Sequence, residues 1–328
     1  MSNPSPYTVS VLMPAFNAAE HIREAMDSIL GQTFTDFEFL IINDGSTDNT
    51  VDIINRYDDP RIKLIHNDGN KGLIYSLNYG LEVAQGKYIA RMDADDIALD
   101  RRLEKQVRFF ENNPDISILG TAFIFMGTPH EIHHPNYNEE IRIKLLDDGA
   151  FAHPTVMMRK NSIDSNDIRY NADYKYIEDY QFWVEAAIKN LKMANLDEVL
   201  LQYRQHFNQV SSQKYEEQEK TKQRIKLEYL SHYFGEYMSP DELISVNKCF
   251  DVDLPSKIAI LDKLSKTNNR YNLFYKKYFD RYINILIYRN VPKDRLISLK
   301  EFLRVIRNNV SLKFITVLFK INIKKLVS

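Results

Sequence analysis

The sequence predicts an α/β protein with a mostly parallel central sheet, followed by a C-terminal helical module. Strand-like and helix-like segments alternate from residue 8 to residue 125. Helical segments rich in Lys and Tyr fill residues 215–328. The charge also changes sign, because residues 1–212 hold 20 basic and 32 acidic residues, whereas residues 213–328 hold 23 and 13. We therefore expect two domains, 1–212 and 213–328.

The composition is that of a globular protein. The 328 residues are 44% hydrophobic and 27% charged, which is enough apolar material for a sizeable core. The lone cysteine, Cys249, excludes an intrachain disulfide framework and fits a reducing cytosol. Neither a signal peptide nor an apolar run long enough to span a membrane is found. These features predict a cytoplasmic protein.

Apolar periodicity and turn residues assign the elements of the first domain in order. Residues 8–13 are rich in β-branched residues and predict a strand that Pro14 ends. Asn17 is expected to cap the first helix and Gly31 to close it. Gly86 is expected to end the third helix, and Asp100 to cap the fourth. The other predicted elements are strands at 38–43, 62–66, 88–92 and 116–125, and helices at 50–57, 73–81 and 103–110.

Three carboxylates follow the predicted strand at 88–92. Asp93, Asp95 and Asp96 would emerge at the carboxyl end of that strand, where open α/β sheets bind ligands. Alternation along an extended backbone puts Asp93 and Asp95 on the same side. Paired carboxylates of this kind suit Mg²⁺ or Mn²⁺, with phosphate oxygens completing the shell. The alternative is a solvated turn that caps the next helix.

Other turns limit how a nucleotide could be held. No glycine precedes Gly31, so the first strand-to-helix turn lacks a dinucleotide fingerprint, and no Ser or Thr follows Lys87 to make a phosphate loop. Asp44 ends the second strand at the same edge as Asp93. Its carboxylate either stabilises the turn or accepts an N–H from a base such as uracil. The spacing does not decide between these alternatives.

Four motifs in order carry a family resemblance. They are residues 9–17 (VSVLMPAFN), residues 43–48 (NDGSTD), Asn70-Lys71-Gly72, and residues 90–96 (ARMDADD). Together they resemble the nucleotide-sugar half of a family 2 glycosyltransferase with the Rossmann-like GT-A fold, over about residues 7–210. The resemblance implies transfer of a sugar from a nucleotide diphosphate donor, with inversion and with Mn²⁺ or Mg²⁺ as cofactor.

The resemblance also implies roles for residues of the donor site. Asp44 would contact the base, Asp93 the ribose or a metal-bound water, and Asp95 the metal, while Asp96 would orient the loop or the sugar. For Arg91, a structural ion pair with the carboxylates at the carboxyl ends of the strands is favoured over direct contact with the diphosphate. Arg204 or His206 would reach the diphosphate or the metal. The remaining donor-site residues are Pro14, Ala15, Phe16, Asn17, Asn70, Gly72 and Ala94.

The acceptor side depends on residues 176–183. Glu178 and Asp179 are explained equally well as an acidic first helical turn, but the resemblance implies that Asp179 deprotonates the acceptor hydroxyl. Glu178 would orient a neighbour or bind the acceptor. His153 could contact sugar or serve as a structural histidine, and Trp183 could stack on a sugar or belong to the core.

The expected reaction is addition of a single sugar from a UDP-sugar to a saccharide or lipid-linked saccharide, in cell-surface polysaccharide biosynthesis. The Gln-x-x-Arg-Trp signature of processive members is absent, because His206 and Phe207 follow Gln205. The alternatives are a metal-dependent nucleotidyltransferase and a non-catalytic sugar-nucleotide-binding partner in a membrane complex. Residues 311–328 predict an amphipathic helix that lies on an anionic membrane or packs on the catalytic domain. No nucleic acid is expected as a partner.

Overall fold

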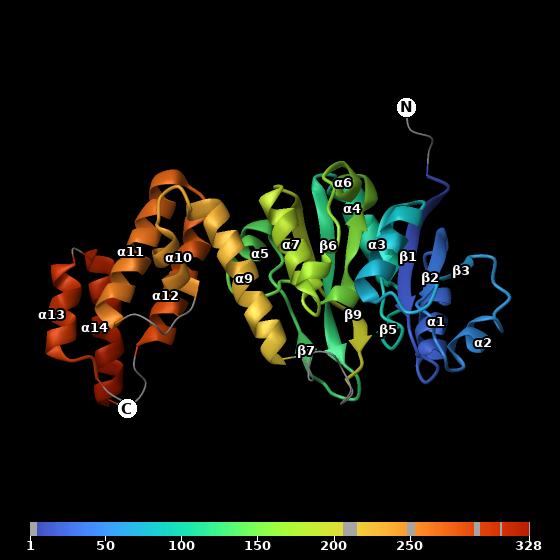
Figure 1. Ribbon diagram of the computed structural model, residues 1–328, viewed down its shortest axis with the longest axis horizontal. Coiled ribbons are helices and arrows are strands. Elements are labelled where there is room, and N and C mark those ends of the chain that lie inside the picture. The colour runs from blue at the N-terminus through green and yellow to red at the C-terminus, as the bar shows by residue number, and fades with distance from the viewer. Residues whose placement is uncertain (1–4, 206–214, 248–252, 292–295, 309, 328) are drawn as a thin grey trace. The chain divides into compact units, whose positions relative to one another are not determined.

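The computed structural model describes residues 5–205, 215–247, 253–291, 296–308 and 310–327 (Figure 1). The chain divides into two compact units, residues 1–221 and residues 222–328. The first unit contains one sheet covered by helices, and the second contains helices. Within the described ranges, no helix is long and apolar enough to cross a membrane.

Nine strands of the described chain form one sheet. Their order is β3-β2-β1-β4-β8-β6-β9-β5, with β7 paired to β6. The pairings of β1 with β2 and β4, of β2 with β3, and of β6 with β9 are parallel, whereas β8 is antiparallel to β4 and β6. The strands are β1 (Tyr7–Ala15), β2 (Phe37–Asn43), β3 (Ile62–His66), β4 (Gly86–Arg91), β5 (Ile97–Ala98), β6 (Ile116–Phe125), β7 (Glu131–Ile132), β8 (Met157–Arg159) and β9 (Lys192–Tyr203).

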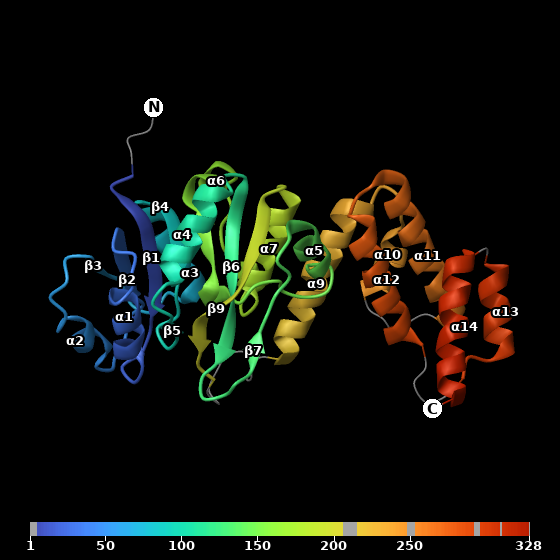
Figure 2. The same ribbon diagram turned by 180° about the vertical axis from the view of Figure 1, so that it is seen from behind.

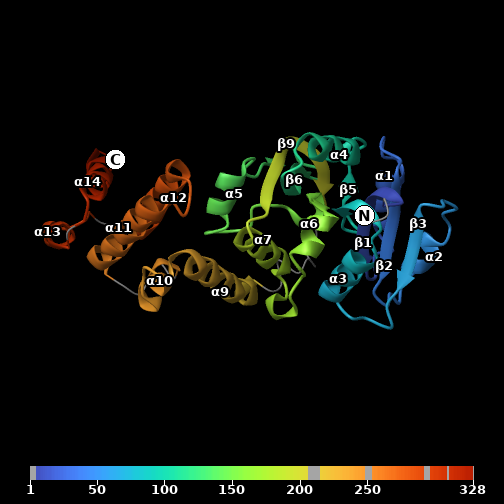
Figure 3. The ribbon, with the colours of Figure 1, turned by 90° about the horizontal axis from the view of Figure 1, so that it is seen from above.

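Helices cover both faces of this sheet. Figures 1 and 2 show α3, α6 and α7 on one face and α1 and α4 on the other, and Figure 3 separates the two layers. The helices and 3₁₀ turns of this unit are α1 (Ile22–Leu30), α2 (Thr50–Ile54), α3 (Leu73–Val83), α4 (Arg102–Asn112), α5 (Asn138–Lys144), η1 (His153–Thr155), α6 (Lys160–Ser165), η2 (Ala172–Tyr174) and α7 (Glu178–Ile188).

Strand β1 is buried on both sides. Val9, Val11 and Met13 pack in one cluster with the apolar residues of α1 and α4. Leu12 points to the other face, where a Cβ on Gly80 of α3 would meet the Leu12 side chain. Because the strand is packed on both sides, its carboxyl end is held rigidly, and this fixes the start of the loop that follows it.

Four sequence expectations about element ends were wrong. Strand β1 continues through Pro14 to Ala15. The Pro14 nitrogen faces β4, but the pairing of β1 with β4 ends earlier, at Leu12 and Arg91, so the missing N–H breaks no hydrogen bond of the sheet. Asn17 is not a helix cap, because α1 begins at Ile22 without a side-chain cap and the Asn17 side chain binds another loop. Gly86 begins β4 rather than ending α3. Asp100 does not cap α4, since no side chain caps that helix.

The second unit is built from helices. Helix α9 (Tyr215–Phe234) spans the division between the units. The remaining helices are α10 (Pro240–Asn247), α11 (Leu254–Tyr271), α12 (Lys276–Asn290), α13 (Leu299–Arg307) and α14 (Leu312–Val327). Phe234, Phe274 and Phe279 stack with ring centroids 5.6–6.0 Å apart and form the aromatic centre of the unit.

Candidate functional site

The candidate site lies at the carboxyl ends of three parallel strands. Asp44 follows β2, and Asp93 comes two residues after β4 ends. Strand β1 runs between them, with Ala15 at its own carboxyl end. Adjacent strands are about 4.8 Å apart, so the two acids flank one strand at the same edge of the sheet. This is the place predicted for a ligand in an open α/β sheet.

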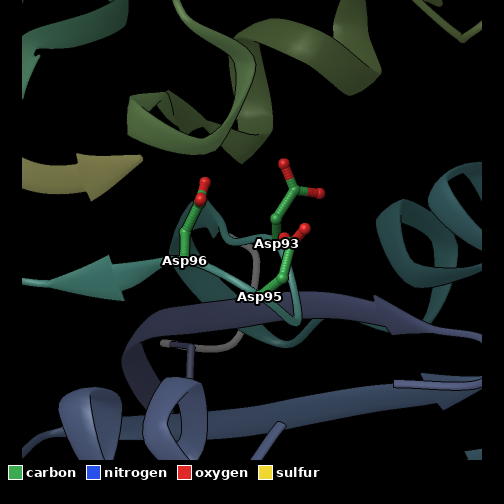
Figure 4. A group of neighbouring side chains, drawn as sticks. All are labelled: Asp93, Asp95 and Asp96. Atoms are coloured by element: carbon green, nitrogen blue, oxygen red, sulfur yellow. The ribbon is translucent and has the colours of Figure 1, made fainter. Parts of the chain in front are cut away.

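Three carboxylates cluster at this edge. Ligand oxygens of Asp93, Asp95 and Asp96 all lie within 4.8 Å of one another, and Figure 4 shows the three side chains rising from one loop. Asp96 is almost fully buried, and burial together with Asp93 raises its pKa to about 8. Its Oδ2 is buried without a hydrogen-bond partner among the described residues.

The residues present fit a divalent metal ion. Mg²⁺ and Mn²⁺ prefer oxygen ligands, and the three carboxylates supply oxygens at one point. Carboxylates this close repel one another unless a proton or a cation joins them. The orphaned Oδ2 of Asp96 is an acceptor that such a cation, or a water bound to it, would satisfy.

Arg91 forms the base of the cluster. Its guanidinium is 3% exposed and makes an ion pair with Asp93, as the sequence predicted. A second buried arginine, Arg102, donates from Nη2 to the Arg91 carbonyl at 2.6 Å. Burial, reinforced by Arg91, lowers the pKa of Arg102 to about 9. The acidic edge therefore has positive charge fixed directly beneath it.

The loop after β1 is tied to the loop after β2. Asn17 has a positive φ of 49°, and its Oδ1 accepts from the Thr47 backbone N–H at 2.8 Å. The Ala18 N–H donates to Thr50 Oγ1 at 2.8 Å. Phe16, 47% exposed, lies in the first of these loops, while Pro14 and Ala15 belong to β1. The two loops form one wall beside the acidic cluster.

Asp44 organises a third loop. Its Oδ1 accepts from Asn67 Nδ2 at 2.7 Å and from the Lys71 N–H at 2.8 Å, and its Oδ2 accepts from the Gly72 N–H at 2.8 Å. Asp44 thus stabilises the segment that contains Asn70 and Gly72 rather than its own turn. Gly45 (φ +74°) permits this approach, because a Cβ there would lie 2.7 Å from the Asn70 nitrogen.

Two further carboxylates begin helix α7. Burial and the neighbouring Asp179 raise the pKa of Glu178 to about 7. Burial also raises the pKa of Asp179, and the Arg91 guanidinium opposes both shifts. The Arg91 guanidinium therefore influences the pair on α7 as well as Asp93, with which it forms its ion pair. Asp179 Oδ1 accepts from the Tyr180 N–H at 2.7 Å.

His153 and Trp183 take structural positions. His153 is 9% exposed, its Nε2 lies 2.8 Å from the Tyr170 hydroxyl, and burial lowers its pKa well below the ordinary value. Trp183 has no exposed surface and packs against Phe151 and His153. No face of the indole is open to a sugar, which agrees with the core alternative.

Tyr170 was not identified from the sequence. It precedes η2 in an irregular segment, where no hydrophobic period marks a residue. Its backbone N–H donates to Asn78 Oδ1 at 2.9 Å, and its ring stacks on Phe182 of α7. Arg91, Asp179 and Glu178 all affect its pKa, which burial raises. Tyr170 therefore packs against His153 and against helix α7.

Arg204 closes the cluster from the end of β9. Its backbone N–H donates to Asp96 Oδ1 at 2.9 Å, and its Nε donates to the Asp95 carbonyl at 2.8 Å. Its Nη2 pairs with Glu24 of α1. In this arrangement Arg204 orients the loop that carries Ala94 and Asp95. His206, the other predicted partner of the metal, lies outside the described residues.

The sequence has relatives of known class. The sequence model described as Glycosyl transferase family 2 matches residues 10–166. An uncharacterized glycosyltransferase of Haemophilus influenzae is 34% identical over 317 residues, covering 91% of this chain and 97% of that protein. The UDP-Glc:alpha-D-GlcNAc-diphosphoundecaprenol beta-1,3-glucosyltransferase WfaP of Escherichia coli is 31% identical, covering 64% of this chain and 82% of WfaP.

Solved structures share the fold. TarS 1–349 of S. aureus in complex with UDP-GlcNAc superposes with a TM-score of 0.58 at 19% identity, covering 94% of this chain and 90% of that one. The mannosyltransferase PcManGT of Pyrobaculum calidifontis, in complex with GDP-Man and Mn²⁺, has a TM-score of 0.52 at 16% identity, with 89% and 90% covered. Together with the near full-length match to the Haemophilus protein, this places the chain in glycosyltransferase family 2, with the GT-A fold.

Proposed function

We propose that this enzyme transfers one sugar from a UDP-sugar to a hydroxyl of a saccharide or lipid-linked saccharide, with inversion at the anomeric carbon. The observation that carries the proposal is the pair of acidic groups around Arg91: Asp93, Asp95 and Asp96 at the strand ends, and Glu178 and Asp179 on α7. One group suits a diphosphate held through a cation, and the other suits a proton acceptor.

A uridine nucleotide is favoured by the relatives and by the chemistry of the strand ends. WfaP is named for a UDP-Glc donor, and TarS was solved with UDP-GlcNAc. Asp44 Oδ2 accepts only one of the three hydrogen bonds that the described residues donate to this carboxylate, from the Gly72 N–H, and so keeps a lone pair as an acceptor beside the loop at Asn70. Uracil has an N–H that such an acceptor can bind, whereas cytosine lacks it at the equivalent position.

The metal ion would be bound by Asp95 and Asp93, with Asp96 as the third carboxylate, and His206 remains a proposed additional ligand. When bound, Mn²⁺ or Mg²⁺ neutralises the charge that develops on the departing diphosphate. Arg91 holds Asp93 in place, and Arg204 holds the backbone at Asp95. These contacts pre-organise the carboxylates before a donor arrives.

Asp179 is the proposed general base. Inverting transfer needs one base on the face of the sugar opposite the leaving group. Burial raises the pKa of Asp179, which makes its carboxylate a better proton acceptor than an exposed aspartate. Asp179 would take the acceptor's hydroxyl proton while that oxygen attacks the anomeric carbon. Glu178 would orient the acceptor or its neighbour.

The acceptor is proposed to belong to cell-surface polysaccharide assembly, and the enzyme to work at the cytoplasmic face of the cell membrane. WfaP is named for an acceptor linked to diphosphoundecaprenol, a lipid carrier. The absence of the processive signature after Gln205 favours addition of one sugar at a time. The relatives described above are glycosyltransferases, which removes support from the nucleotidyltransferase alternative.

A donor screen with an Asp179→Asn variant tests this proposal. UDP-sugars are incubated with the full chain, with Mn²⁺ or with EDTA, and released UDP is measured. We expect one UDP-sugar to be turned over with metal, and Asp179→Asn to lose about 10²- to 10⁴-fold in rate while binding UDP normally. Asp173→Asn, an exposed change on η2, should retain activity. Full turnover by Asp179→Asn would remove Asp179 from the role, and no turnover or UDP binding by the wild type would favour a non-catalytic partner.

A further inference from the structure

Helix α13 exposes the middle of its apolar face. Leu299, Leu303 and Ile306 follow one another at spacings of four and three residues, which places them on one side of the helix, and they are 74%, 47% and 45% exposed. Val305, on the inner edge of the same face, is fully buried and attaches the helix to its unit. A capping box between Ser298 and Glu301 fixes where the helix begins.

Helix α14 has two apolar sides. Phe314 and Leu318 are buried, so this part of the apolar stripe, for which the sequence left membrane contact and packing on the catalytic domain open, is covered by protein. Phe319 and Leu312, seven residues apart and therefore on one face, remain 57% and 77% exposed. The rings of Phe302 and Phe319 lie 6.5 Å apart, which joins the exposed sides of α13 and α14.

Basic residues flank these exposed side chains. Residues 296–328 contain seven Lys or Arg and one acid, Glu301, whose carboxylate is used in the capping box. Lys300 and Arg307 lie seven residues apart on the side of α13 next to Leu303, and Lys320 adjoins Phe319; all three are exposed. We define the α13–α14 surface as the exposed residues Leu299, Leu303, Ile306, Leu312, Phe319, Lys300, Arg307 and Lys320, together with the half-buried Phe302.

We propose that the α13–α14 surface docks the enzyme onto an anionic lipid bilayer. An apolar strip bordered by cations matches the acyl region and the negative headgroups of such a surface. A second copy of this chain matches it less well, because a two-fold contact would bring the cations of both copies together. The inference deepens the proposed action on lipid-linked acceptors, but it depends on surface chemistry alone.

Vesicle sedimentation of the full chain tests the surface. Vesicles of phosphatidylcholine with 30% phosphatidylglycerol, about the charge density of an anionic leaflet, are compared with vesicles of phosphatidylcholine alone. We expect binding to the anionic vesicles that weakens with salt and falls sharply without phosphatidylglycerol. Leu299→Ser/Leu303→Ser/Ile306→Ser should reduce the partition coefficient at least about 30-fold. Lys300→Gln/Arg307→Gln/Lys320→Gln should reduce it about 100-fold, near fivefold for each cation.

The matched control is Tyr275→Ser/Ile285→Ser/Tyr288→Ser, which removes three exposed apolar side chains elsewhere in the same unit. It should bind vesicles like the wild type, and all variants should keep the wild-type circular dichroism spectrum and UDP affinity. The proposal would be overturned if the wild-type protein does not bind anionic vesicles, or if the variants of the α13–α14 surface bind these vesicles as well as the control variant does. A wild-type dimer that the surface variants convert to monomers, without vesicle binding, would assign the surface to a second copy. UDP binding is read separately, so failure here leaves the proposed transferase activity intact.

Discussion

Replacing Asp44 by Asn should release the loop at residues 67–72. The Asp44 carboxylate accepts three hydrogen bonds, from Asn67 Nδ2 and from the N–H groups of Lys71 and Gly72. Asparagine has the same shape but only one acceptor oxygen. Its amide nitrogen must therefore face at least one of these donors. If the amide oxygen takes the position of Oδ1 and keeps two hydrogen bonds, the amide nitrogen replaces Oδ2 and faces the Gly72 N–H, which is also a donor.

The cost follows from this geometry. Losing one hydrogen bond to a charged acceptor removes about 2 kcal/mol, and converting the other two from charged to neutral acceptors removes about 1 kcal/mol each. Lys71 is exposed and Gly72 only half-buried, so water can reach part of the freed backbone. We therefore expect a loss of about 2–4 kcal/mol for Asp44→Asn. At least tenfold weaker UDP binding should accompany it, because the loop belongs to the proposed donor site.

Hydrogen exchange and urea unfolding read the effect directly. The amides of Lys71 and Gly72 should exchange about 30-fold faster in Asp44→Asn, which corresponds to about 2 kcal/mol of lost protection. Asp52→Asn removes the same charge from an exposed position in α2 and should change stability by less than about 0.5 kcal/mol. If Asp44→Asn matches Asp52→Asn in stability and in exchange at Lys71 and Gly72, the hydrogen bonds of Asp44 do not hold this loop.

Two more predictions concern the charges of the site. Arg91→Met should lower the free energy of unfolding, measured by urea titration, by about 3 kcal/mol, because Asp93 loses its buried cation. The control Arg101→Met breaks an exposed ion pair with Glu104 and should cost under about 1 kcal/mol. Equal losses in the two variants would contradict a stabilising role for the Arg91–Asp93 pair. The pKa of Glu178 rises from an ordinary 4.5 to about 7 on folding, so the folded state binds more protons and stability should fall as pH increases between these values, by up to about 3 kcal/mol. Thermal unfolding from pH 4 to pH 8 should show a flatter profile for Glu178→Gln, and a wild-type slope in that variant would exclude Glu178 as the source.

The strands and the acidic cluster could be predicted because each has a local signal. The apolar run before Asp93 predicts a buried strand, and the parallel order then brings Asp44 to the same edge. The Arg91–Asp93 pair follows from a charge that must be buried beside an acidic rim. These inferences need only hydrophobic pattern and the geometry of parallel sheets.

Long-range contacts could not be predicted in this way. Asn17 has the composition of a helix cap, but its side chain binds Thr47, thirty residues away, and this tertiary contact prevails over the local preference. Asp44 stabilises a loop that begins more than twenty residues later. Tyr170 lies in an irregular segment, and only the fold brings it to His153. The burial of Phe314 and Leu318 depends on neighbouring helices that amphipathicity alone does not specify.

Calorimetry of UDP binding with and without Mn²⁺ tests the metal-linked diphosphate site most directly. Wild-type protein should bind UDP at least about tenfold more tightly, or 1.4 kcal/mol, in Mn²⁺ than in EDTA. Asp95→Asn should bind UDP with the same weak affinity under both conditions, since the ligand cluster of Asp93, Asp95 and Asp96 is broken. Wild-type binding that is equally tight in EDTA, or an Asp95→Asn variant that responds to Mn²⁺ like the wild type, would contradict a cation held by these carboxylates.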